Sequence, residues 1–370
     1  MKQMVAVPLL VGLAVVVGLL VLPPESYAQR VSSTRVDVRH EGNVYYPQFS
    51  PDGSQIAYEV NYPSEKRTEL WMVGWRGRST DGSAMKLVPE SMASSSRYGG
   101  GKRITHGFSW AGTGKHAFAY SVSDSTGAQA IYVDGWSDMV AFGNSANKNP
   151  DWDPNEARFV FSSGRSGNGD LYLWDSGDPM QLTYDEANAE LYPIFDSSGK
   201  KVAYVRQGKG GSHIFVLDVT NFTTQALVQY EGKESTRPSF SPDSTKVAFF
   251  SNKATESVTR FGLWVTDARP GSTPRNIASQ VYLPSKGAAS WTPDGRAVIA
   301  VKDDPAAGDP ICIFPVDGGA AQCLDLGTRN NRDPELQLLD GSWRLIYTAQ
   351  DKVSESAATW REMYVADLPR

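Results

Sequence analysis

Residues 47–53 read Pro-Gln-Phe-Ser-Pro-Asp-Gly, and the run Ile-Ala-Tyr at 56–58 follows directly. Proline presets φ for a tight turn and aspartate bonds the backbone that follows it, so this turn separates two short strands. The aromatic residue before the turn is an apolar anchor for the first strand. Equivalent anchors recur along the chain at Phe49, Trp110, Trp152, Phe195, Phe240, Trp291 and Leu336.

The spacing of these anchors predicts the fold. Their successive separations are 61, 42, 43, 45, 51 and 45 residues. A period in the forties, built from short strands and turn residues, is typical of a β-propeller in which each repeat forms one blade. We therefore predict an all-β, seven-bladed β-propeller of four-stranded antiparallel blades over residues 29–370.

The repeat also resembles that of the TolB-type (WD40-like) β-propeller family, whose hallmark is Pro-x-Phe-Ser-Pro-Asp-Gly followed by a second apolar strand. The resemblance covers about residues 34–370. TolB carries an additional N-terminal α/β domain for which this chain has no room, so the resemblance implies the propeller architecture and not TolB's role. The motif is nearly intact at 47–58, 238–249 and 291–299, and degenerate at 107–120 and 334–347.

Closure of the ring is predicted from the two ends of the repeat region. The last repeat ends with its third strand at 362–367, so its fourth strand is missing. Residues 34–40 alternate apolar and polar side chains, as a half-buried outer strand does. We expect residues 34–40 to pair with 361–367 and so to close the propeller with the N-terminal strand.

Residues 1–28 have the features of an export segment. Lys2 precedes an apolar run from Val5 to Leu22, and Ser26-Tyr27-Ala28 forms a small-x-small cleavage site. The run is also long enough to remain as an N-terminal membrane anchor that contacts the membrane through residues 5–22. A signal peptide and an anchor both predict a periplasmic or extracellular propeller.

The net charge and the two cysteines bear on the class of partner and on a disulfide. The net charge of −5 argues against nucleic acid as the main partner, which would favour a concentrated basic surface. The two cysteines, Cys312 and Cys323, flank a hairpin around Asp317-Gly318. A two-residue type I′ turn there would place the two sulfurs opposite each other, so we predict a disulfide in preference to two buried thiols.

The motifs of catalysis and metal binding are weak. No two of the four histidines have the short spacing of a zinc motif. Oligogalacturonate lyases have a similar propeller with a histidine cluster around a metal, and the repeats do not reproduce such a cluster. The glycine run at 99–101 lacks the spacing of a phosphate loop, and the run at 107–112 lacks that of a nucleophile elbow. We predict no catalytic, cofactor-binding or metal-binding residues and a protein that is not an enzyme.

Places where the repeats differ are better candidates for a functional site than residues that recur in every blade. The largest departure is the insertion at 88–106, on the face that carries the loops between second and third strands. Tyrosine and arginine are favoured as interface anchors. The predicted partner-binding residues in this insertion are Arg97, Tyr98, Lys102 and Arg103.

These observations favour a non-enzymatic protein-interaction scaffold of the bacterial envelope, such as an accessory subunit of a membrane-associated complex. One alternative is a propeller enzyme or carbohydrate-binding protein that uses the axial pocket. Polar side chains with shifted pKa values converging on the axis would favour it. Another alternative is a structural coat or filament protein.

Overall fold

The structure is a computed structural model that describes residues 29–38, 40–77, 79–82, 84–87, 104–112, 118–123, 129–133, 139–141, 146–155, 157–255, 257–350 and 360–368. Within these ranges, the only helical elements are the short 3-10 helices η1 (Pro63–Glu65), η3 (Gly164–Ser166) and η4 (Pro305–Ala307), and the other ordered elements are β-strands. None of these helices could cross a membrane. The all-β prediction is confirmed, whereas the predicted export segment, residues 1–28, lies outside the described residues.

The strands follow one another as antiparallel meanders. Three separate meanders contain β3 (Asn43–Phe49), β4 (Gln55–Tyr62), β5 (Arg67–Gly74) and β6 (Met85–Lys86); β7 (Ile104–Trp110), β8 (Phe118–Ser123), β9 (Gln129–Val133) and β10 (Met139–Ala141); and β11 (Asn147–Trp152), β12 (Phe159–Ser163), β13 (Asp170–Trp174) and β14 (Met180–Gln181).

The next two meanders are joined into one eight-stranded sheet, because β17 and β19 pair in parallel at one end. They contain β15 (Ala189–Phe195), β16 (Lys201–Gly208), β17 (Gly211–Asp218) and β18 (Thr223–Val228), and then β19 (Lys233–Phe240), β20 (Lys246–Ser251), β21 (Phe261–Asp267) and β22 (Arg275–Val281).

The last strands along the chain form two sheets, each of which also takes one N-terminal strand, β1 (Gln29–Arg30) or β2 (Ser33–Arg35). One sheet contains β23 (Ser290–Trp291), β24 (Ala297–Val301), β25 (Ile311–Pro315), β26 (Gln322–Asp325) and β1; the other contains β27 (Arg332–Leu339), β28 (Ser342–Ala349), β29 (Glu362–Leu368) and β2.

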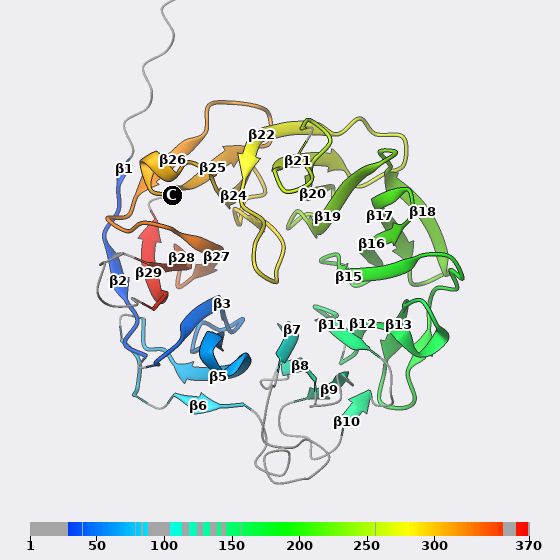
Figure 1. The fold of residues 1–370 in the computed structure, drawn as a ribbon, viewed down its shortest axis with the longest axis horizontal. Helices are drawn as coiled ribbons and strands as arrows, with labels where there is room; N and C mark the ends of the chain where they lie inside the picture. Colours follow the sequence, from blue (N-terminus) through cyan, green and yellow to red (C-terminus); the bar gives the residue numbers. More distant parts are fainter. Residues whose placement is uncertain are drawn as a thin grey trace, which may run out of the picture.

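Figure 1 shows these sheets arranged around a central axis, with the first strand of each meander nearest the axis and the last at the rim. This arrangement is a β-propeller. It positions functional residues in a simple way, because the first strands β3, β7, β11, β15, β19 and β27 lie nearest the axis and contribute residues to the cavities there.

Apolar side chains fill the space between neighbouring sheets. Tyr58 on β4, Tyr204 on β16 and Tyr347 on β28 occupy matching positions and are fully buried. One cluster joins Tyr58 and other residues of β3–β5 to Ile346 on β28 and Met363 on β29. Burial of such large side chains is the main stabilising contribution, because a blade cannot bury both of its faces alone.

The N-terminal strands contact two sheets in turn. β1 pairs in parallel with β26, and β2 pairs antiparallel with β29, with Ser33 opposite Ala366 and Arg35 opposite Tyr364. The backbone N–H of Val36 then donates to the carbonyl of Met363 at 2.9 Å. The paired stretch is shorter and begins earlier than the predicted 34–40.

The predicted disulfide between Cys312 and Cys323 is present, and the two residues lie opposite each other on β25 and β26. The predicted two-residue turn is wrong, although the predicted register is right. The N–H of Gly318 donates to the carbonyl of Pro315 at 3.1 Å, and β26 begins only at Gln322. Gly318, with φ of 85°, is the last residue of this turn, so a longer connection leads to β26.

Candidate functional site

A repeated irregularity marks the axis of the propeller. The pairing register shifts in the middle of β3, β7, β11, β15, β19 and β27, so each of these strands carries a β-bulge. At each bulge one residue has a positive φ: Tyr46 (48°), Gly107 (100°), Asn149 (54°), Tyr192 (52°), Arg237 (55°) and Asp333 (50°).

Five of these six residues are not glycine, although a left-handed conformation costs an L-residue roughly 1–2 kcal/mol. A bulge turns a side chain out of the regular alternation of the strand. Here all six residues precede a proline or Phe108. Strain that recurs where a cavity lies is a reason to look for function there.

The bulges surround two adjoining cavities of about 210 and 80 Å³. Tyr46, Phe108 and Asp151 line both of them. The larger cavity continues between Gln48, Ser109, Ser239 and Glu335, and the smaller one between Asn149, Tyr192, Arg237 and Lys286. We call this combined space the axial cavity.

A segment between β22 and β23, residues 283–289, reaches toward the centre of the ring and forms one wall of the axial cavity (Figure 1). We call it the axial loop. Asp333 anchors it, because its carboxylate accepts hydrogen bonds from the Ser285 N–H at 2.6 Å and from the Ser285 hydroxyl at 2.7 Å. The same carboxylate accepts the Tyr46 N–H at 3.0 Å. A Cβ at Gly287 would lie 2.4 Å from the Tyr46 ring, so only glycine allows the loop to approach this closely.

Two cations reach the axial cavity. Lys286 of the axial loop pairs with Glu59, which is only 2% exposed, at 3.1 Å. The guanidinium of Arg237 lies 4.3 Å from the centre of the Tyr192 ring, and its Nη2 donates a long hydrogen bond to the Ser285 carbonyl at 3.4 Å. Its Nη1 is buried and has no hydrogen-bond partner among the described residues. A buried donor without an acceptor is costly, so this nitrogen is suited to an acceptor group on a ligand.

Two carboxyl groups in the axial cavity hold their protons unusually tightly. Burial raises the pKa of Asp151 to about 7, against the opposing effect of the Phe195 N–H, which donates to it at 2.7 Å. Burial likewise raises the pKa of Glu335 to about 8, and its Oε2 has no partner among the described residues. Both groups therefore exchange protons near neutral pH, as acids and bases in active sites do.

The predicted partner-binding residues, Arg97, Tyr98, Lys102 and Arg103, lie outside the described residues. Of the histidines, His40 packs against Trp71 and lies 2.9 Å from the Tyr58 hydroxyl, where burial lowers its pKa. In the part of the chain that the structure describes, no group of histidine, cysteine and acidic residues could hold a metal ion.

Sequence reasoning missed the axial residues. The sequence did contain a signal for them. In five repeats a proline stands two positions before the apolar anchor, and the residue that precedes this proline is the axial residue. That residue changes from repeat to repeat, as Tyr46, Asn149, Tyr192, Arg237 and Asp333.

Comparison with known proteins identifies the architecture. No family model and no curated protein matches the chain. Among solved structures, the chain is similar to TolB from Acinetobacter baumannii, with 17% identity and a TM-score of 0.52, over 80% of this chain and 66% of that one. It is similar to a puromycin-hydrolyzing peptidase from Mycobacterium tuberculosis, with 13% identity and a TM-score of 0.59, over 87% and 52%. It is also similar to an oligogalacturonate lyase from Vibrio parahaemolyticus, with 14% identity and a TM-score of 0.57, over 92% and 98%.

The fold is thus a TolB-like β-propeller, and the chain spans less than two thirds of the length of TolB and about half that of the peptidase. The same matches overturn the prediction that the protein is not an enzyme. Two of these three structures are enzymes, and the lyase is covered almost completely. A propeller of this shape and length is therefore no reason to exclude catalysis.

Proposed function

We propose that the protein binds a small, acidic, polyhydroxylated molecule of the carbohydrate class in its axial cavity. The observation that carries this proposal is Arg237, which lines the smaller cavity and has one buried guanidinium nitrogen without a partner among the described residues. A carboxylate on the ligand would supply that acceptor in the charge-assisted geometry that arginine favours.

The rest of the lining suits the remainder of such a ligand. Aromatic rings of Tyr46, Tyr192 and Phe108 offer apolar faces, and Gln48 and Ser109 offer polar groups for hydroxyls. The larger of the two cavities has a volume of about 210 Å³. This is smaller than the roughly 300–1,000 Å³ of pockets for drug-sized ligands, so the ligand is the size of one or two small rings.

The cavity also has groups for proton transfer. Asp151, with a pKa of about 7, would accept a proton from a bound hydroxylated acid or return one to it. A propeller enzyme acting on the same ligand is therefore the second candidate function, supported by the two carboxyl groups at the axis.

Isothermal titration calorimetry with glucuronate and with glucose tests the binding proposal. We expect glucuronate to bind more tightly than glucose. Arg237→Gln should weaken glucuronate binding by roughly 30-fold or more, because a buried charge pair that loses one partner costs about 2 kcal/mol at least. Arg260→Gln, on a loop outside the axial cavity, is the matched control. Equal binding of glucuronate by Arg237→Gln and the parent, or no binding at all, would contradict the proposal.

We further propose that the propeller has seven blades and that β2 closes its ring. The pairing of β2 with β29 and the apolar cluster that joins β3–β5 to β28 and β29 support this interpretation. Removal of residues 29–36 should expose the edge of β29 and cause aggregation, which light scattering would detect. A truncated protein that stays monomeric with an unchanged melting temperature would refute closure by β2.

Export to the bacterial envelope and binding of a protein partner there remain proposals. The Cys312–Cys323 disulfide and the TolB-like fold support an oxidising compartment. Cell fractionation with intact-mass analysis of the N-terminus tests the location and the fate of residues 1–28. Replacement of Arg97, Tyr98, Lys102 and Arg103 by serine tests the proposed role of the insertion in partner binding.

A further inference from the structure

A second hollow lies away from the axis, where the sheet β11–β14 meets β15–β18. It is an open groove of about 410 Å³ between the connection at residues 182–187 and the face of the next sheet, including Arg206, Phe222 and Thr224. The outer strand β14 beside the groove is two residues long, whereas the next outer strand, β18, has six.

Two exposed aromatic side chains form walls of this groove. Tyr184 is 76% exposed and Phe222 is 52% exposed. Phe222 also has a φ of 57°, a conformation that bulky residues rarely adopt and that asparagine or glycine would adopt at lower cost. The turn thus holds an exposed phenylalanine where local preferences favour another residue. Violations of this kind are expected where a residue serves function.

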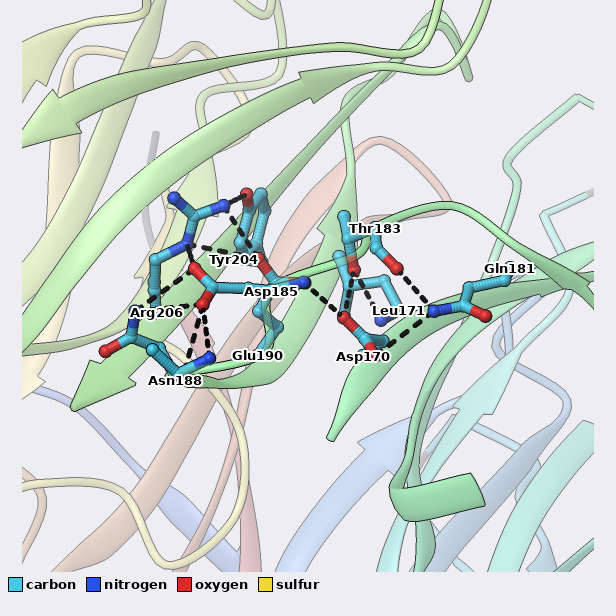
Figure 2. A network of polar contacts seen from close by, with 10 residues as sticks. Asp170, Leu171, Gln181, Thr183, Asp185, Asn188, Glu190, Tyr204 and Arg206 are labelled. Carbon is cyan, nitrogen blue, oxygen red and sulfur yellow. Dashed lines mark hydrogen bonds and ion pairs between the residues drawn. The ribbon is translucent and has the colours of Figure 1, made fainter. Parts of the chain in front are cut away.

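A network of hydrogen bonds holds the wall that carries Tyr184. Figure 2 shows Asp170 holding the connection, with its carboxylate accepting the Asp185 N–H at 3.0 Å and the Gln181 side chain at 3.2 Å. Asp185 in turn accepts the backbone N–H and the side-chain amide of Asn188. The Leu171 N–H donates to the Thr183 hydroxyl at 2.9 Å. A wall held by such bonds lowers the entropic cost of binding, because little must be ordered when a partner arrives.

The groove has an excess of negative charge. Arg206 bridges Asp185 at 3.1 Å and Glu190 at 2.8 Å, so its charge is already matched (Figure 2). Hydrogen bonds from Asn188 and the charge of Arg206 outweigh the effect of burial and lower the pKa of Asp185, which keeps it ionised at neutral pH. Glu186 lines the groove as a further, exposed carboxylate.

We propose that this groove binds a lysine or arginine side chain on an extended segment of a partner protein, between the rings of Tyr184 and Phe222. Aromatic faces attract cations, and nearby carboxylates strengthen that attraction. The site is distinct from the axial cavity, and the proposal does not depend on what the axial cavity binds.

Fluorescence anisotropy with a labelled peptide in which lysine alternates with serine tests this proposal on the purified protein. We expect the lysine peptide to bind and its counterpart with glutamate in place of lysine not to bind. Tyr184→Ala and Phe222→Asn should each weaken binding by about tenfold, and Glu186→Gln by a smaller factor. The melting temperature of Phe222→Asn should equal or exceed that of the parent, because asparagine tolerates the left-handed conformation.

Controls separate this site from general attraction of a basic peptide to an acidic protein. Tyr184→Phe keeps the ring and should bind like the parent, and Val258→Ser alters a side chain that is 78% exposed elsewhere and should also leave binding unchanged. Arg237→Gln should affect glucuronate binding only. The proposal is overturned if Tyr184→Ala and Phe222→Asn bind the lysine peptide as the parent does, or if Val258→Ser weakens binding as much as they do.

Discussion

In the part of the chain that the structure describes, two features recur from repeat to repeat: the turns after the first strands, and the bulges within the first strands β3, β7, β11, β15, β19 and β27. The two features are built on opposite principles. In three turns the same side chains make the same contacts. The hydroxyl of the residue before the turn donates to the turn aspartate at 2.6 Å in each of the pairs Ser50–Asp52, Ser241–Asp243 and Thr292–Asp294. These bonds satisfy the turn locally, without help from the rest of the chain.

At the bulges the backbone conformation recurs while the side chain changes. The φ values of Tyr46, Tyr192, Arg237 and Asp333 differ by a few degrees, but the four residues offer a phenol, a cation and an anion. A residue that recurs supports the blade, whereas a position that recurs with different residues builds an asymmetric site from a symmetric scaffold.

The carboxyl groups of the turns and those at the axis also differ in the direction and cause of their pKa shifts. Hydrogen bonds from Ser241 and Thr245 lower the pKa of Asp243 in its turn. Burial raises the pKa of Asp151 and Glu335 at the axis. In the turns, local hydrogen bonds stabilise the charged carboxylate. At the axis, removal from water favours the neutral carboxyl group.

The largest expected effect on stability comes from the turns. Asp52→Ala, Asp243→Ala and Asp294→Ala should each cost about 1 kcal/mol, because each removes hydrogen bonds to a charged group at an exposed site. The turns are far apart, so the triple variant should lose about 3 kcal/mol of unfolding free energy in urea denaturation. Glucuronate binding should be unchanged under native conditions. A triple variant as stable as the parent would show that these turns do not support the fold.

The axial acids should make stability depend on pH. Asp151 and Glu335 have pKa values of about 7 and 8 in the folded protein, against 3.8 and 4.5 for ordinary side chains. Because the folded state holds these protons more tightly, their stabilising contribution is complete below about pH 4 and is lost as the pH rises through 7 and 8. We therefore expect the free energy of unfolding to fall as the pH rises over that range.

The variant Asp151→Asn with Glu335→Gln should remove this part of the pH dependence. Urea denaturation of parent and variant between pH 5 and 8 measures the difference. Identical pH dependence in the two proteins would show that the axial acids are ionised throughout.

The smallest effect on stability is expected at a bulge. Tyr192→Asn relieves left-handed strain, which roughly offsets the lost contact of the ring with Arg237, so the unfolding free energy should change by less than about 1 kcal/mol. Glucuronate binding should nevertheless weaken, because the cavity loses an aromatic wall. Tyr230→Phe, outside the axial cavity, is a control for loss of a tyrosine group. Unchanged glucuronate binding by Tyr192→Asn would remove this tyrosine from the site.

The sequence by itself determined the repeat, because its signals are local. A Pro-Asp-Gly turn such as 51–53 satisfies its own hydrogen bonds, and alternation of apolar residues reports which face of a strand is buried. The register of Cys312 opposite Cys323 followed from the hairpin in the same way. For that reason the all-β propeller and the disulfide could be predicted from residues close together in the chain.

Only the tertiary structure decided where the sites lie. Asp151 and Glu335 are 184 residues apart in the chain, and neither is unusual until packing of the sheets around the axis removes both from water and raises their pKa values. Arg237 on β19 contacts Ser285 of the axial loop, and Tyr184 and Phe222 line one groove although they belong to different sheets' connections. Burial of these acids, and the meeting of residues from distant parts of the chain, depend on elements that are far apart in sequence. Local sequence patterns therefore do not predict them.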